Sequence, residues 1–278
     1  MISHAFVVDF DPVAFHLFGR PAHWYGLSYL FAIFVGWLLG RLRTWQYPGR
    51  GFTAKQVDAF ACCIGFGVVF GGRIGYKLVY EPFLPGWQAS HLWEIGKGGM
   101  SFHGGLIGAM AALWFAKRHV GRFYMEVLDF IAPLAPLGVG AVRIGNFING
   151  ELWGKATNLP WGMIFPGARD GMPRHPSPLY EFFFEGLVLF AVIWWFSSKS
   201  RPTMAVSGLF MTLYGTFRIL IEFVRVPDKD PGYLAFGWVT MGQLLTLPVL
   251  ALGVLWLWMA YGRRDHQGPR QRTHRHHQ

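Results

Sequence analysis

The chain has 278 residues, of which 53% are hydrophobic, 18% are aromatic and only 14% are charged. A soluble domain of this length would carry about 25% charged residues, so the composition excludes an ordinary soluble protein and favours a membrane protein. The formal net charge is +10, but no nucleic-acid-binding motif accompanies it. We therefore attribute the charge to membrane topology and to contact with anionic lipids, and expect no nucleic acid partner.

Apolar windows nearly free of charge recur along the whole chain, and several of them are close to the shortest length that crosses a bilayer. This pattern predicts an all-α polytopic membrane protein with seven transmembrane helices. The windows are 24–40, 57–72, 100–116, 127–142, 179–196, 205–224 and 234–261.

The basic residues between these windows predict the orientation of the chain, because cytoplasmic loops are enriched in Lys and Arg. One alternate set of connections carries 14 basic residues and one acidic residue, Asp265, whereas the other set is longer and carries ten basic and eight acidic residues. The N-terminus is therefore expected outside and the C-terminus in the cytoplasm. The basic set comprises 41–56, 117–122, 197–202 and 261–278.

The chain shows no polar linker that would separate two domains, so residues 1–262 are predicted to form a single transmembrane catalytic domain. The connection 143–177 is rich in tryptophan and other apolar residues, which favours a small external cap at the level of the lipid headgroups. The basic segment 263–278 is predicted to be a disordered cytoplasmic tail. Outside that tail no Cys/His cluster has the spacing of metal ligands, and we expect neither a metal nor another cofactor.

The stretch "LYGTFRILIEFVR" places ionisable side chains within a predicted span, where they are costly and by default indicate a functional site. Tyr214, Arg218, Glu222 and Arg225 fall within an arc of about 80° on one helix face. Glu222 can pair with either arginine. Two arginines against one carboxylate leave a surplus of positive charge, and this surplus favours an anionic ligand over a purely structural ion pair.

The stretch "VRIGNFINGELWG" ends the fourth window with a second polar cluster. A polar cap on a helix end would explain one asparagine. It does not explain Arg143, Asn146, Asn149 and Glu151 together unless an anionic, hydrogen-bonding group is held there.

Other candidates are weaker when taken singly. His103, in "SFHGG", lies at the predicted outer end of the third span among glycines, and a histidine can accept a proton near neutral pH. Tyr25 lies at the outer start of the first span, where a residue of the aromatic belt is the simpler interpretation. His175 precedes the fifth span, and Glu185, one turn after Glu181, has a packing or a site role.

The chain resembles bacterial prolipoprotein diacylglyceryl transferases. The motifs that carry the resemblance are "VRIGNFINGELWG", "SFHGG", "RHPSPLYE", "GLFMTLYGTFRILIEFVR" and "MGQLL", and they follow in order between about Asp11 and Tyr261. One departure from the family pattern is Val142, which stands where a glycine is common before the arginine. Every polar member of that motif is in place.

The resemblance implies a multi-pass enzyme of the bacterial inner membrane with its active site toward the periplasm. Such an enzyme transfers the sn-1,2-diacylglyceryl group of phosphatidylglycerol to the thiol of the lipobox cysteine in prolipoprotein signal peptides. It forms a thioether and releases glycerol phosphate. The resemblance assigns catalysis to His103, Arg143, Asn146, Glu151, Tyr214 and Arg218, and binding of phosphatidylglycerol to Arg143, Tyr25, Gly154, Glu222 and Arg225.

This chemistry suggests a role for each polar group. We expect Arg143 and Arg218 to hold the phosphate, Asn146 and Tyr214 to add hydrogen bonds, and Glu151 and Glu222 to orient the arginines. His103 is the candidate base for the thiol, although a thiol between two arginines can also ionise unaided. The alternatives are a transporter of an anionic solute and a lipid transferase with another acceptor. A transporter is disfavoured because the sequence lacks paired broken helices and repeat symmetry.

Overall fold

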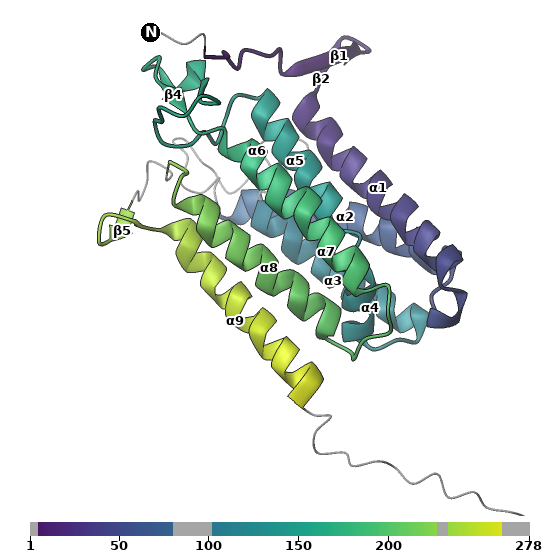
Figure 1. Ribbon diagram of the computed structural model, residues 1–278. Coiled ribbons are helices and arrows are strands. Elements are labelled where there is room, and N and C mark those ends of the chain that lie inside the picture. Colours follow the sequence, from purple (N-terminus) through teal and green to yellow (C-terminus); the bar gives the residue numbers. More distant parts are fainter. Residues whose placement is uncertain (1–4, 80–101, 227–232, 263–278) are drawn as a thin grey trace, which may run out of the picture.

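The computed structural model describes residues 5–79, 102–226 and 233–262. The described helices lie side by side as an elongated bundle, with short strands gathered at one end (Figure 1). In chain order the helices are α1 (Trp24–Gln46), α2 (Ala54–Val79), α3 (Phe102–Val120), α4 (Tyr124–Ile131), α5 (Pro136–Ile148), α6 (Ser177–Glu181), the π-helix η5 (Phe182–Val188), α7 (Leu189–Phe196), α8 (Ala205–Glu222) and α9 (Met241–Gly262).

Five helical stretches in the described residues are long and apolar enough to cross a membrane, and the bent pair of α4 and α5 makes a sixth. Its two halves meet at an angle of 49°. The prediction of a mostly helical membrane protein is therefore confirmed, with five or six candidate spans. The helix α3 begins within the predicted window 100–116 and is not among these candidates. The count of seven stays a prediction.

Large apolar side chains point away from the bundle along these helices. Only 6% of the most apolar window of α1 is buried within the protein. Phe31, Phe66, Ile107 and Trp258 are each more than half exposed. A soluble protein rarely exposes so much contiguous apolar surface, whereas lipid chains solvate it without cost.

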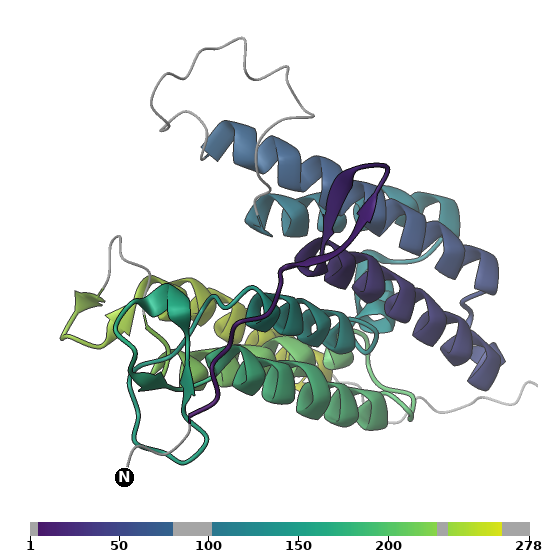
Figure 2. The same cartoon turned by 90° about the horizontal axis from the view of Figure 1, so that it is seen from above.

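The helices α2 and α3 pack backbone against backbone (Figure 2). Gly67 and Gly71 of α2 face Gly104 and Gly108 of α3, and a Cβ atom added to Gly108 would lie 2.9 Å from the Gly67 carbonyl carbon. Each pair is spaced four residues apart, which is the small-xxx-small pattern that lets membrane helices approach closely. The glycine-rich sequence of these two helices is thus explained by their contact.

Short antiparallel strand pairs lie at the end of the bundle where α1 begins (Figure 1). The N-terminal segment joins this end, since Val8 N donates to Ile164 O at 2.9 Å and Ile164 N donates to Phe6 O at 2.9 Å. Phe165 is buried there against Phe147 and Trp153. The strands are β1 (Val13–Leu17), β2 (Arg20–His23), β3 (Met163–Ile164), β4 (Pro173–Arg174), β5 (Tyr233–Ala235) and β6 (Val239–Thr240).

Replacing Gly108 by valine tests the packing of α2 on α3. The new side chain would overlap the Gly67 backbone, and we expect a loss of about 1–3 kcal/mol of stability, read as a lower thermal unfolding midpoint in detergent. Gly49→Ala is the matched control, because a Cβ atom at Gly49 meets nothing within 4 Å. An unchanged midpoint for Gly108→Val would contradict this packing.

Candidate functional site

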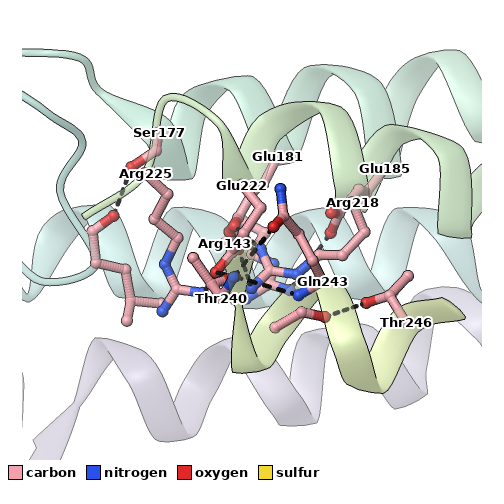
Figure 3. A network of polar contacts seen from close by, with 12 residues as sticks. Arg143, Ser177, Glu181, Glu185, Arg218, Glu222, Arg225, Thr240, Gln243 and Thr246 are labelled. Carbon is pink, nitrogen blue, oxygen red and sulfur yellow. Dashed lines mark hydrogen bonds and ion pairs between the residues drawn. The ribbon is translucent and has the colours of Figure 1, made fainter. Parts of the chain in front are cut away.

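Three arginines and three glutamates form one ion-pair network inside the bundle (Figure 3). They come from α5, α6, η5, α8 and the segment that follows α8. The network lies toward the end of the bundle that carries the strands. Its members are Arg143, Glu181, Glu185, Arg218, Glu222 and Arg225.

Arg143 is held between two carboxylates. Its Nε lies 3.1 Å from Glu181 Oε2, and its Nη2 donates to Glu185 Oε2 at 3.3 Å. Both glutamate side chains are completely buried, whereas the Arg143 side chain is 15% exposed. The arginine is therefore the member of this trio that an approaching ligand can reach.

Close packing of two glycines makes these ion pairs possible. A Cβ atom added to Gly140 of α5 would lie 3.1 Å from the Cα of Gly186 in η5. The two helix backbones therefore meet one turn from Arg143 and next to Glu185. Glu185 lies in η5, which is a π-helical turn, and such distortions of a helix are frequent at functional sites.

Glu181 and Glu222 extend the network to the other two arginines. Glu181 also accepts a hydrogen bond from Arg218, so it bridges two guanidinium groups. Glu222 Oε2 lies 3.1 Å from Arg218 Nη2 and 3.5 Å from Arg225 Nη1. The expected pairing of Glu222 with the arginines of its own segment is thus present with both of them.

The start of α9 fixes the other oxygen of Glu222. Thr240 Oγ1 donates to Glu222 Oε1 at 3.0 Å and accepts from Gln243 N at 3.2 Å. Gln243 Oε1 in turn accepts from Thr240 N at 3.1 Å, which completes a capping box at the helix N-terminus. Helix capping and site geometry therefore depend on the same threonine.

The structure changes the charge count that the sequence suggested. Within α8 two arginines face one carboxylate, but Glu181 and Glu185 add two buried negative charges from the neighbouring helix. The network thus contains as many carboxylates as arginines, and the expected surplus of positive charge is absent from it. Arg225 also lies beyond the end of α8, where it forms an isolated β-bridge with Gly154, so it does not share the helix face of Arg218.

A second polar group lies at the end of α5. Asn146 Nδ2 donates to Glu151 Oε1 at 2.8 Å, and Asn149 Nδ2 donates to the same oxygen at 3.3 Å. Glu151 thus orients two amides, where we had expected it to orient an arginine.

The two predicted tyrosines lie on different helices, Tyr25 on α1 and Tyr214 on α8. The hydroxyl groups of Tyr25 and Tyr29 are 3.0 Å apart on α1. Tyr214 lies one helical turn before Arg218 on α8. A Cβ atom added to Gly145 of α5 would lie 3.3 Å from the Cα of Tyr25, so Tyr25 packs against α5 two residues from Arg143.

Gly154 links the network to the segment between α5 and α6. Its N–H donates to His175 O at 2.8 Å, and its carbonyl accepts from Arg174 Nη1 at 3.1 Å. A Cβ atom at this position would lie 2.6 Å from the His175 Cβ, so glycine fits here. Burial lowers the pKa of His175, and the hydrogen bond from Arg174 lowers the pKa of Asp170.

The sequence indicates most of the described members of this site, but it does not indicate that Glu181 and Glu185 form ion pairs with the arginines. The available signal was their spacing, since two carboxylates one turn apart in an apolar span require cationic partners. The side chain of His103 lies outside the described residues, and its place relative to Arg143 stays a prediction.

Comparison with known proteins identifies the family of this chain. A family model described as "Prolipoprotein diacylglyceryl transferase" matches residues 12–259, which include every member of the network. The chain belongs to the prolipoprotein diacylglyceryl transferase family.

Individual relatives in this family match over most of their length. A protein of Solidesulfovibrio magneticus is 54% identical over 252 residues, which cover 90% of this chain and 94% of the relative. Proteins of Nitratidesulfovibrio vulgaris and Pseudomonas putida are 52% and 50% identical over 264 and 262 residues, with 97% of each relative covered. All three carry the name phosphatidylglycerol–prolipoprotein diacylglyceryl transferase.

Replacing Gly242 by alanine tests whether the start of α9 sets the position of Glu222. A Cβ atom at Gly242 would lie 2.6 Å from Glu222 Oε1, so the carboxylate must move and loosen its hold on Arg218 and Arg225. We expect transferase activity to fall about tenfold, equivalent to about 1.4 kcal/mol. Gly262→Ala, at the other end of α9, meets only ordinary contacts at 3.7 Å and should retain full activity. Equal activity of the two variants would refute the role of this contact.

Proposed function

We propose that this protein transfers the sn-1,2-diacylglyceryl group of phosphatidylglycerol to the thiol of a lipobox cysteine in prolipoprotein signal peptides. The products are a thioether and glycerol phosphate. Membership of the family over residues 12–259 supports this assignment. The observation that carries it is the partly exposed side chain of Arg143, whose guanidinium is held on fully buried carboxylates in a helical membrane bundle.

The polar network provides the electrostatics for this reaction. The sulfur forms a bond to the glycerol carbon, the bond from that carbon to the phosphate oxygen breaks, and the thiol loses its proton. The departing phosphate carries negative charge, which fixed cations stabilise without reorganising. Arg143 and Arg218 hold the phosphate in this account, and guanidinium groups suit this role because they bind phosphate in a bidentate manner.

The remaining site residues hold the phosphatidylglycerol substrate. Tyr214 hydrogen-bonds the phosphate between the two arginines, and Glu222 keeps Arg218 and Arg225 in place. Asn146, oriented by Glu151, hydrogen-bonds the glycerol head, and Tyr25 and Gly154 border the binding site. An apolar pocket of about 280 Å³ lies beside the C-terminal end of α8, and Phe184, Phe217 and Leu220 line it. This pocket offers the hydrophobic surface that a lipid substrate requires.

The membrane setting is part of the proposal. The protein lies in the bacterial inner membrane with seven spans, its N-terminus and active site face the periplasm, and its C-terminus lies in the cytoplasm. Residues 1–262 form the catalytic domain, and the part of 143–177 that follows the end of α5 at Ile148 forms its external cap. The distribution of Lys and Arg between alternate connections supports this orientation.

Release of glycerol phosphate from phosphatidylglycerol, with a lipobox peptide as acceptor, tests the function. We expect release with the cysteine peptide and none with its Cys→Ser variant. Arg143→Ala should reduce the rate at least about 100-fold, because the departing phosphate loses a preorganised hydrogen-bond donor that stabilises its negative charge. Arg41→Ala is the matched control and should retain the rate, because Arg41 of α1 forms an exposed ion pair with Asp58 of α2 and lies outside the network. Release without the thiol would indicate a hydrolase or another acceptor, and no release at all would favour a transporter.

His103→Gln tests the proposed base. If His103 takes the thiol proton, the variant should lose about 100-fold or more of the rate near neutral pH and recover part of it at high pH, where the thiol ionises unaided. The measurement is the initial rate of thioether formation between pH 6 and 9. Near-normal turnover of His103→Gln, with Arg143→Ala inactive, would remove the base role and leave the phosphate site intact.

A further inference from the structure

Glu185 is the most weakly held carboxylate of the network. Its Oε2 accepts from Arg143 Nη2 at 3.3 Å, and its Oε1 is buried without a hydrogen-bond partner among the described residues. Glu181, by contrast, bridges two arginines, and Glu222 is held by two arginines and Thr240. Replacing the glutamate partner of an arginine by another anion therefore costs the least free energy at Glu185.

A bound lipid phosphate would disturb the charge balance of the network. Three arginines and three glutamates are neutral together, and a phosphodiester adds one negative charge. An uncompensated charge in a buried site is costly, and a carboxyl group in such a site avoids the cost by binding a proton. The charge count thus requires a proton acceptor once the donor lipid is bound.

We propose that Glu185 takes up one proton when the donor phosphate binds, and that Arg143 exchanges the Glu185 carboxylate for the phosphate. In this step Arg143 Nη2 moves from Glu185 Oε2 to a phosphate oxygen. A proton from water converts the carboxylate into a carboxylic acid, and no covalent bond of the lipid changes. The proton leaves again when glycerol phosphate departs. This inference rests on the proposed function.

The surroundings of Glu185 offer no better proton acceptor. The charged and titratable groups that face it from the described residues are Arg143 on α5, Glu181 on α6, and Tyr214 and Arg218 on α8. The adjoining helix α7 consists of apolar residues only. Among these groups the carboxyl groups alone can take up a proton, and Glu181 is held by two arginines. Glu185 is thus a positioning residue: its carboxylate holds Arg143, and its protonation frees the guanidinium to bind the phosphate.

Proton uptake can be measured directly by isothermal titration of the full-length protein in detergent micelles with short-chain phosphatidylglycerol and no peptide. Comparing binding enthalpies in buffers of different ionisation enthalpy gives the number of protons bound per lipid. We expect about one proton for the wild type and none for Glu185→Gln. Glu126→Gln, a surface carboxylate on α4, is the matched control and should behave as the wild type. Diacylglycerol with the same chains lacks the phosphate and should take up none.

The pH dependence of donor binding gives a second readout that a structural role would not change. Because binding consumes a proton, the dissociation constant of the wild type should rise by up to about tenfold per pH unit in the range where free Glu185 is ionised. Glu185→Gln carries the neutral form permanently, so its affinity should not vary over that range. An infrared difference spectrum should show the carbonyl band of a protonated carboxyl group on lipid binding, absent in the variant.

The outcomes separate this inference from the proposed function. Thioether formation by the wild type, with binding that takes up no proton, would overturn the role of Glu185 and leave the transferase in place. Equal uptake in wild type and Glu185→Gln would also overturn it. If Glu185→Gln fails to fold, the wild-type titration and infrared band still decide. No turnover under any condition would instead contradict the proposed function.

Discussion

A guanidinium group inside a membrane bundle must be paired, and this requirement organises the centre of the protein. Arg143, Arg218 and Arg225 each contact at least one buried carboxylate, and two of the three carboxylates serve two arginines. The ion pairs hold α5, α6, η5 and α8 in one arrangement, because removing one partner would leave an uncompensated buried charge. The same pairing keeps each guanidinium group oriented before a ligand arrives.

The close approach of helix backbones makes this pairing possible. Gly140 against Gly186 brings the Glu185 carboxylate of η5 to Arg143, and Gly242 leaves room for the carboxylate of Glu222 against the start of α9. The strand-bearing end adds a third constraint, since Gly154 pairs with the backbone of Arg225. Site geometry therefore depends on glycines that carry no chemistry themselves. A balanced network also explains how arginines persist in lipid without a substrate and how one of them is released when a phosphate arrives.

The sequence predicts part of this arrangement. Helical spacing correctly pairs Arg218 with Glu222, because this contact is local along α8. The partners Glu181 and Glu185 depend on how η5 packs against α5, which periodicity does not reveal, and so the positive surplus inferred from α8 is wrong. A regular helical repeat places Arg225 on the same helix, whereas α8 ends at Glu222 and the chain turns there. The apolar windows predict a helical membrane protein, but the 49° bend between α4 and α5 makes the number of spans harder to predict.

The central claim is that Arg143 leaves a carboxylate partner to hold the phosphate of the donor lipid. A structure of the protein with a non-transferable phosphonate analogue of phosphatidylglycerol tests it most directly. The account predicts phosphonate oxygens within hydrogen-bond distance of the Arg143 guanidinium, with the Glu185 contact lengthened and the Glu181 contact retained. A phosphonate bound elsewhere, with Arg143 still on both glutamates, would contradict it.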